Sequence, residues 1–150
     1  MLDCKSMATP MDTNLKLLFD DKLVDVTQYR HIIGSLMYLT NTRPYICFVV
    51  NTLSQYLVKD RRVHLIVAKH VMRYLKGTID FGLYYDRDHD YRLYGYTDSD
   101  WEGSAAYKKI TSGGCYYLGS AMISWFSKKQ SIVALSTAEV TVHCSLLCLL

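Results

Sequence analysis

Proline is scarce in this sequence, and no apolar run is long enough to cross a membrane. Only 2 prolines occur among 150 residues, which excludes collagen-like chains. The 5 cysteines include no CxxC pair or repeated spacing, so neither a zinc ribbon nor a disulfide scaffold is expected. Their odd number indicates reduced thiols. The longest apolar stretch, Cys144 to Leu150, is far shorter than the roughly 20 residues that span a bilayer.

A targeting segment is also missing from the first residues. Positions 1 to 15 contain Asp3, Lys5, Pro10 and Asp12 and no apolar run of signal-peptide length, so we expect the chain to begin in the cytosol. The net charge of +3, from 17 basic and 14 acidic residues, is too small to indicate nucleic-acid binding by itself. Half of the residues (50%) are hydrophobic, which favours a packed core.

The first half of the chain predicts helices. Residues 1–26 show no periodicity and indicate an extended arm. Apolar residues then recur at helical spacing, which predicts a helix over 27–40 capped by Thr27, a second over about 45–58, and a third over about 63–76 that stops at Gly77. In the second helix, Cys47, Val50, Leu53, Ser54 and Leu57 share one side. Residues 27–78 therefore form a helical module.

The third predicted helix has a basic side and an apolar side. At 100° per residue, one narrow stripe contains Arg62, Lys69, Arg73 and Lys76, and the opposite side contains Val67, Val71, Tyr74 and Leu75. Such a stripe is typical of a solvated face, but it also suits a helix that faces phosphate groups.

After Gly77 the hydrophobic period changes from 3.6 to 2. Segments 81–85, 91–97, 113–118 and 121–127 are rich in Tyr and separated by Gly, which predicts a strand meander with a hairpin at Gly119-Ser120 and a loop at 86–90. Thr137 and Glu139 open an apolar run typical of a final buried helix. The expected class is α+β.

The sequence Tyr96-Thr97-Asp98-Ser99-Asp100-Trp101 is the candidate catalytic motif. Two residues apart on a strand, Asp98 and Asp100 would share a face and could bind one Mg²⁺ ion. We expect the strand that ends in this motif to be otherwise buried. A turn that begins as the strand ends would account for the same Asp-x-Asp sequence without a metal site. Glu139 is a possible third carboxylate, or a first-turn residue that suits the helix dipole.

The spacing of the histidines, and of the two cysteines near the C-terminal end, indicates structural roles. No metal-ligand spacing joins His64, His70 and His89. Cys144 and Cys148 lie one turn apart on the apolar final helix, where buried thiols are the usual outcome.

Four long motifs resemble one family. YRHIIGSLMYLTNTRPYICFVVNTLSQYL, AKHVMRYLKGT, GYTDSDWEG and ISWFSKKQSIVALSTAE, in this order, are similar to the copia-type retrotransposon polyprotein, from the end of its reverse transcriptase to the start of its ribonuclease H. The resemblance includes the CKSMATPMD arm. It implies a thumb-like helical module at 27–78, whose basic stripe contacts phosphates of a template-primer, and a truncated ribonuclease-H-like half-domain at 79–150 with one C-terminal helix.

The resemblance also implies a role for each carboxylate. Asp98 matches the first metal-binding Asp of ribonuclease H, and Asp100 accompanies it without being the core ligand. The family pattern STAEAEY departs here to STAEVTV, which places Thr141 at the expected Glu position. Tyr45, His70 and Ile110 are smaller departures. Further metal-binding Asp residues would lie after Leu150 and before Met1, so we expect no polymerase or nuclease activity, no cofactor, and Mg²⁺ only if nucleic-acid function persists.

The truncated sheet and the length of the chain point to a second resemblance. A missing fourth strand would expose the edge of 91–97, where several of the 13 tyrosines provide contact surface. A chain that begins near CKSMATPM and ends soon after LSTAE resembles secreted RxLR-type effectors of filamentous plant pathogens. This resemblance implies that the protein is secreted and enters a host cell, where a nuclear location is one option. It also implies an unknown host protein as partner and suppression of host cell death as the function.

The sequence itself contains no Arg-x-Leu-Arg, only the near match Arg73-Tyr-Leu-Lys76. Without secretion, a cytoplasmic or nuclear location is expected. The alternatives to an effector are a remnant with weak nucleic-acid binding and a genomic relic without a selected role.

Overall fold

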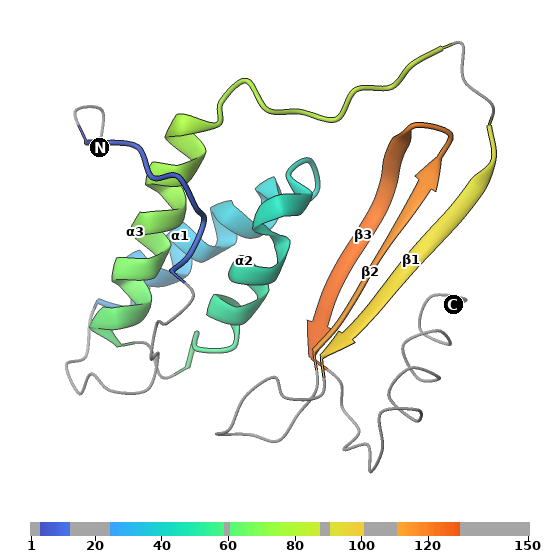
Figure 1. The fold of residues 1–150 in the computed structure, drawn as a ribbon. Helices are drawn as coiled ribbons and strands as arrows, with labels where there is room; N and C mark the ends of the chain where they lie inside the picture. The colour runs from blue at the N-terminus through green and yellow to red at the C-terminus, as the bar shows by residue number, and fades with distance from the viewer. Residues whose placement is uncertain (1–3, 13–24, 59–60, 88–90, 101–110, 130–150) are drawn as a thin grey trace. The chain divides into compact units, whose positions relative to one another are not determined.

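The computed structural model combines helices with an antiparallel sheet, which confirms the α+β class (Figure 1). It describes residues 4–12, 25–58, 61–87, 91–100 and 111–129, and for Ser99 and Asp100 the backbone alone. The chain divides into two compact units, Met1–Gly82 and Leu83–Leu150. We call them the helical unit and the sheet unit. In the described residues, no helix is long and apolar enough to cross a membrane.

Helix α1 spans Val26–Leu39, close to the predicted range. Its cap is Asp25 and not Thr27, so the predicted cap is wrong. A carboxylate oxygen of Asp25 accepts hydrogen bonds from the backbone N–H groups of Thr27 (3.0 Å) and Gln28 (3.5 Å). Asp caps a helix as well as Thr does, and its negative charge also suits the positive end of the helix dipole.

The second predicted helix is shorter than expected. A 3₁₀ turn, η1 (Pro44–Ile46), leads into α2 (Cys47–Ser54). The Ser54 hydroxyl donates to the Asn51 carbonyl (2.8 Å). Ser and Thr side chains compete with helical backbone bonds in this way. After Ser54 the backbone continues to Leu57 with 3₁₀-type hydrogen bonds, each from an N–H to the carbonyl three residues earlier. Of the residues predicted to share one side of this helix, Val50 and Leu53 are buried, and Cys47, Ser54 and Leu57 are half-buried.

Helix α3 spans Arg62–Gly77, one residue longer at each end than predicted. At its start, the N–H of Arg61 donates to Nδ1 of His64 (3.1 Å). The His64 ring is buried and stacks on Tyr56, with ring centroids 4.1 Å apart. His64 is therefore a structural residue that joins the start of α3 to the end of the α2 segment.

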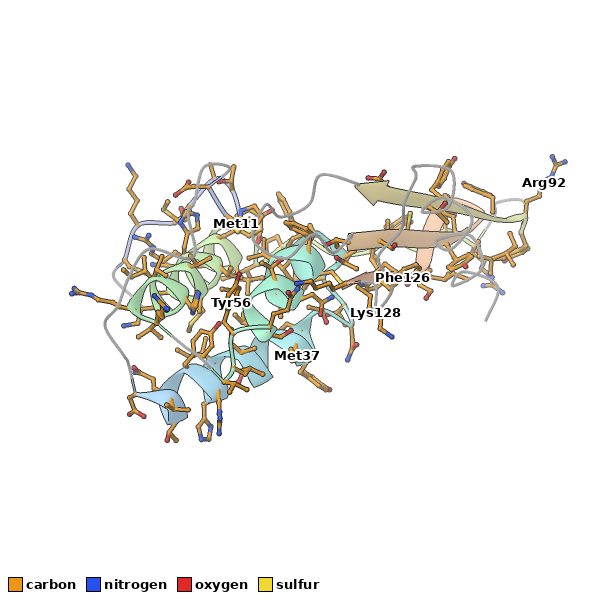
Figure 2. The ribbon with its side chains drawn as sticks, turned by 90° about the horizontal axis from the view of Figure 1, so that it is seen from below. Met11, Met37, Tyr56, Arg92, Phe126 and Lys128 are labelled. Atoms are coloured by element: carbon orange, nitrogen blue, oxygen red, sulfur yellow. The ribbon has the colours of Figure 1, made fainter. Side chains whose placement is uncertain are left out.

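The core of the helical unit lies where the three helices meet. Figure 2 shows the described side chains, and the labelled Met11 and Tyr56 lie beside the helices of this unit. The hydroxyl of Tyr29, in the first turn of α1, donates to the Leu53 carbonyl of α2 (2.8 Å). The buried hydrophobic residues are Tyr29, Ile33, Leu36, Ile46, Val49, Val50, Leu53, Leu65, Val67, Ala68, Val71 and Tyr74.

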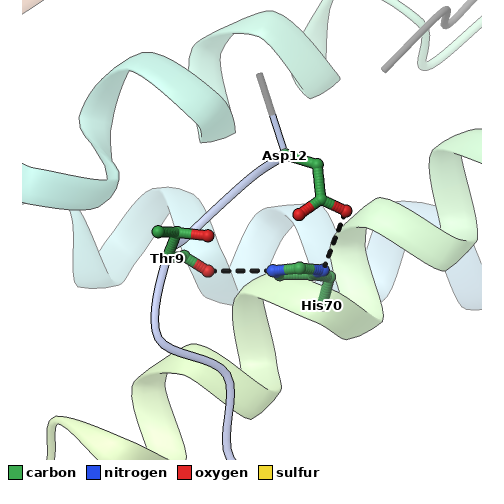
Figure 3. A network of polar contacts seen from close by, with 3 residues as sticks. All are labelled: Thr9, Asp12 and His70. Carbon is green, nitrogen blue, oxygen red and sulfur yellow. Dashed lines mark hydrogen bonds and ion pairs between the residues drawn. The ribbon is translucent and has the colours of Figure 1, made fainter. Parts of the chain in front are cut away.

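The arm of residues 4–12 lies along α3, with neither helix nor strand in it (Figure 1). The N–H of Met7 donates to the Arg73 carbonyl (3.4 Å), and Lys76 Nζ donates to the Cys4 carbonyl (2.9 Å). His70 is buried beneath the arm (Figure 3). Its Nε2 bonds the Thr9 carbonyl (2.8 Å), and its Nδ1 lies 4.0 Å from a carboxylate oxygen of Asp12.

Replacing His70 with leucine is expected to loosen this arm. The Thr9 carbonyl loses its hydrogen bond, which costs about 1 kcal/mol, or roughly a fivefold change in the fraction of time that the arm is detached. Cleavage by trypsin after Lys5, an exposed arm residue, should therefore be about fivefold faster. The matched control is His31→Leu on the exposed side of α1, which should leave the rate unchanged. Equal rates for the two variants would contradict the docking role of His70.

The sheet contains β1 (Leu93–Asp100), β2 (Thr111–Leu118) and β3 (Ala121–Lys129) in the order β1-β2-β3. Both pairs are antiparallel, and the β2–β3 register shifts between Tyr116 and Tyr117. Gly119 has φ 61°, a left-handed conformation that glycine adopts without strain, in the turn between β2 and β3. The predicted meander over these three strands and its hairpin at Gly119-Ser120 are confirmed.

Two predictions about the sheet are wrong. Residues 81–85 form no strand, because the backbone of Phe81 is engaged elsewhere: its N–H donates to the Thr78 carbonyl (3.1 Å) and its carbonyl accepts from Arg43. With no strand before it, Asp86 does not begin a hairpin loop, and 88–90 lie outside the described residues. Strand β1 is not buried: the side chains described for it are exposed. The final helix predicted from Thr137 also lies outside the described residues.

Candidate functional site

Asp98 lies within β1 and not in a turn. It is paired with Gly113 of β2, and Asp100, the last residue of β1, is paired with Thr111, so both aspartates belong to the strand. A turn that begins after Asp100 would lie outside the described residues. Alternation along the strand places these two residues on one face of the sheet, as the spacing predicts. The Asp98 side chain is exposed to solvent.

A two-metal site requires several carboxylates, because they must balance the charge of two cations. Among the described residues, no group of three or more His, Cys, Asp or Glu side chains could hold a metal ion. Glu139 and Thr141 lie outside these residues, as do His89, Cys144 and Cys148. A metal-binding role for Asp98 therefore stays a prediction.

Three tyrosines gather on the same face as Asp98, and we call Tyr94, Tyr96 and Tyr117 the tyrosine cluster. Tyr94 and Tyr117 face each other across β1 and β2 and stack almost in parallel, with ring centroids 5.5 Å apart and planes at 4°. Tyr96 meets both rings edge-on at 5.9 Å. The Tyr94 hydroxyl donates to the Gly119 carbonyl (2.6 Å). The sequence predicts tyrosine-rich strands, but the cluster itself depends on their register.

The tyrosine cluster is partly exposed to solvent. The exposed fractions of Tyr94 and Tyr96 are 42% and 62%. Partial burial raises the pKa of Tyr117 above its ordinary value, and the nearby Cys115, Tyr94 and Tyr96 groups raise it further. The exposed part of the cluster can offer ring faces and hydroxyl groups to a partner.

The basic stripe on α3 lies mainly at the surface of the helical unit. Arg62, Lys69 and Lys76 are exposed, and Arg73 is half-buried. The exposed Ile66 (53%) lies in the same stripe, between Arg62 and Lys69. On the opposite side, Val67, Val71 and Tyr74 are buried, as the periodicity predicts, and Leu75 is half-buried. Contact between this stripe and phosphate groups stays a prediction.

Comparison with known proteins connects the chain to transposon polyproteins. It is 44% identical over 141 residues to the retrovirus-related Pol polyprotein from transposon RE2 of Arabidopsis thaliana, a match that covers 93% of this chain and 10% of the polyprotein. An uncharacterized mitochondrial protein of the same plant is 39% identical over 93% of this chain and 58% of its own length.

A third relative, secreted RxLR effector protein 161 of Plasmopara viticola, is 39% identical over 112 residues, which are 74% of this chain and 79% of the effector. No protein-family model and no solved structure matches the chain. The chain thus spans only about a tenth of the RE2 polyprotein and just over half of the mitochondrial protein. At these identities, over nearly the whole chain, it belongs to the family of retrovirus-related Pol polyproteins from copia-type transposons.

Proposed function

We propose that this chain is a non-catalytic protein derived from a copia-type polyprotein that acts through protein contacts, as a secreted effector that suppresses host plant cell death. The observation that carries this proposal is the match to the RxLR effector protein of Plasmopara viticola, which extends over 79% of that protein. The polyproteins, in contrast, contain this segment as a tenth of their length. A host protein of unknown identity would be the partner, and the host cell its location.

The surface of the sheet unit supports a contact function. The exposed tyrosine cluster provides amphipathic rings, which are enriched in protein interfaces because they bury a large area and still form hydrogen bonds.

Transient expression in plant leaves with a cell-death inducer tests this function. The chain is expected to reduce the area of dead tissue, and a variant with Tyr94→Ser and Tyr96→Ser should lose this effect at equal protein accumulation. Tyr38→Ser is the matched control, because Tyr38 is 78% exposed on α1 of the helical unit. Unchanged cell death with good accumulation of the chain would contradict the effector role and favour a genomic relic.

Nucleic-acid binding is a second candidate function, favoured by the exposed basic stripe on α3. Phosphate contacts release counterions, so the affinity for an RNA–DNA hybrid should fall steeply with salt concentration. Lys69→Ala is expected to reduce the slope of log K against log salt by about one. Lys128→Ala, at an exposed lysine of β3, should leave the slope unchanged. Equal slopes for Lys69→Ala and the parent chain would exclude the stripe as the binding surface.

A further inference from the structure

The outer edge of β1 has backbone groups that point away from the sheet. The N–H of Gly119 donates to the Arg92 carbonyl (3.0 Å), so the backbone groups of Arg92 face β2. In a regular antiparallel pair this direction alternates, and the β1–β2 register has no shift. Leu93, Gly95 and Thr97 therefore direct their N–H and C=O groups to the outer edge. All three residues are exposed.

The two edges of the described sheet differ in their protection. Beside β3 the register is shifted, and the strand ends in Lys128 and Lys129. A bulge and edge lysines are features that prevent pairing with another strand. Strand β1, Leu-Tyr-Gly-Tyr-Thr-Asp-Ser-Asp, contains no proline, lysine or bulge. It is thus the edge of this sheet that can accept another strand.

We propose that β1 pairs antiparallel with β1 of a second copy of this chain, with the two Gly95 residues opposite each other at the two-fold axis. Leu93 then faces Thr97 of the second copy, and each facing pair exchanges two backbone hydrogen bonds. The two sheets become one continuous sheet through an interface that is the same on both copies.

Charge complementarity selects a second copy as the occupant. Arg92 lies at one end of β1, where its side chain extends away from the strands (Figure 2), and Asp98 lies near the other end. Antiparallel pairing about Gly95 places each Arg92 opposite Asp98 of the other copy, on the same face. A parallel arrangement would place like charges side by side, which is unfavourable.

The same register brings the aromatic residues together. Tyr94 faces Tyr96 of the second copy, twice across the axis, so the tyrosine clusters of the two copies form one row of rings. Cross-strand aromatic pairs stabilise a sheet. Strand β1 is therefore complementary to a second copy of itself in backbone hydrogen bonds, charge and ring contacts. A peptide of unrelated sequence would provide only the backbone hydrogen bonds.

Sedimentation velocity over a range of concentrations tests the pairing. The chain is expected to show a reversible monomer–dimer equilibrium. Thr97→Pro removes an outward N–H from each copy and no β1–β2 hydrogen bond, so it should weaken the dimer by about tenfold or more. Thr97→Val retains that N–H and is the matched control, with unchanged association. A chain that stays monomeric at all concentrations, or a Thr97→Pro variant that dimerises like the parent chain, would overturn the proposal.

A charge exchange tests the register, with circular dichroism to verify that every variant is folded. Arg92→Asp and Asp98→Arg should each weaken the dimer, because each places like charges opposite one another. The double variant, with both changes in one chain, should recover the association of the parent chain. A double variant as weak as the single ones would overturn the antiparallel arrangement about Gly95.

Discussion

Replacing Leu53 with alanine is expected to lower the free energy of unfolding of the helical unit by about 2–5 kcal/mol. Leu53 has an exposed fraction of 0% and lies in the core between the three helices. Removing its side chain loses apolar burial and leaves a cavity, which close-packed neighbours fill only in part. Its backbone carbonyl, which accepts the Tyr29 hydroxyl, is retained, so the loss reports packing.

Urea unfolding followed by far-ultraviolet circular dichroism measures this effect. The matched control is Met37→Ala on α1, where the side chain is 44% exposed and the change should stay within about 0.5 kcal/mol. If Leu53→Ala unfolded at the same urea concentration as the parent chain, the described core would not be the one that stabilises the helical unit.

Replacing Arg43 with alanine is expected to destabilise the helical unit by about 2–3 kcal/mol. Its guanidinium donates to the carbonyls of Thr78 (3.1 Å), Ile79 (2.9 Å) and Phe81, and to the Tyr45 hydroxyl (2.7 Å). These bonds join the start of η1 to the segment that follows α3. The effect is smaller than the sum of its bonds because the arginine is half-buried and water compensates in part.

The variant Arg43→Lys separates the contribution of the positive charge from that of the hydrogen-bond geometry. Arg43→Lys retains the positive charge but cannot reach three carbonyls with a planar fork, so it should recover less than half of the lost stability. Arg62→Ala, at an exposed arginine of α3, is the control and should change the urea midpoint little. Full recovery by lysine would show that the charge, and not the hydrogen-bond geometry, matters.

The helices could be predicted from sequence because the information is local. Ile33 and Leu36 in α1, and Val67 and Val71 in α3, recur at helical spacing and are buried in the structure. The cap of α1 was harder to place, since Asp25 and Thr27 both suit a cap and only the backbone conformation decides between them.

Contacts between distant residues explain where the prediction of the fold is wrong. Residues 81–85 have the composition of a strand, yet Arg43, almost forty residues earlier, binds the carbonyl of Phe81 and those just before it. In addition, the Tyr85 hydroxyl donates to the Met122 carbonyl (3.1 Å), a side-chain bond that no strand pattern indicates. Local propensity cannot anticipate either interaction.

The part of the candidate site that depends on local spacing could be predicted from the sequence, and the part that depends on strand pairing could not. The spacing of Asp98 and Asp100 predicts their shared face, which depends only on the period of a strand. The tyrosine cluster requires the pairing of Tyr94 with Tyr117, which depends on the register between β1 and β2 and not on the period of one strand.

Incubation of the purified chain with an RNA–DNA hybrid and Mg²⁺ is the most direct test of non-catalytic function. No cleavage above the level of a heat-denatured sample is expected, and Asp98→Asn should behave like the parent chain, because Thr141 stands where the family has the Glu that would complete a two-metal site. Cleavage that requires Mg²⁺ and disappears in Asp98→Asn would contradict this and show a working ribonuclease H site.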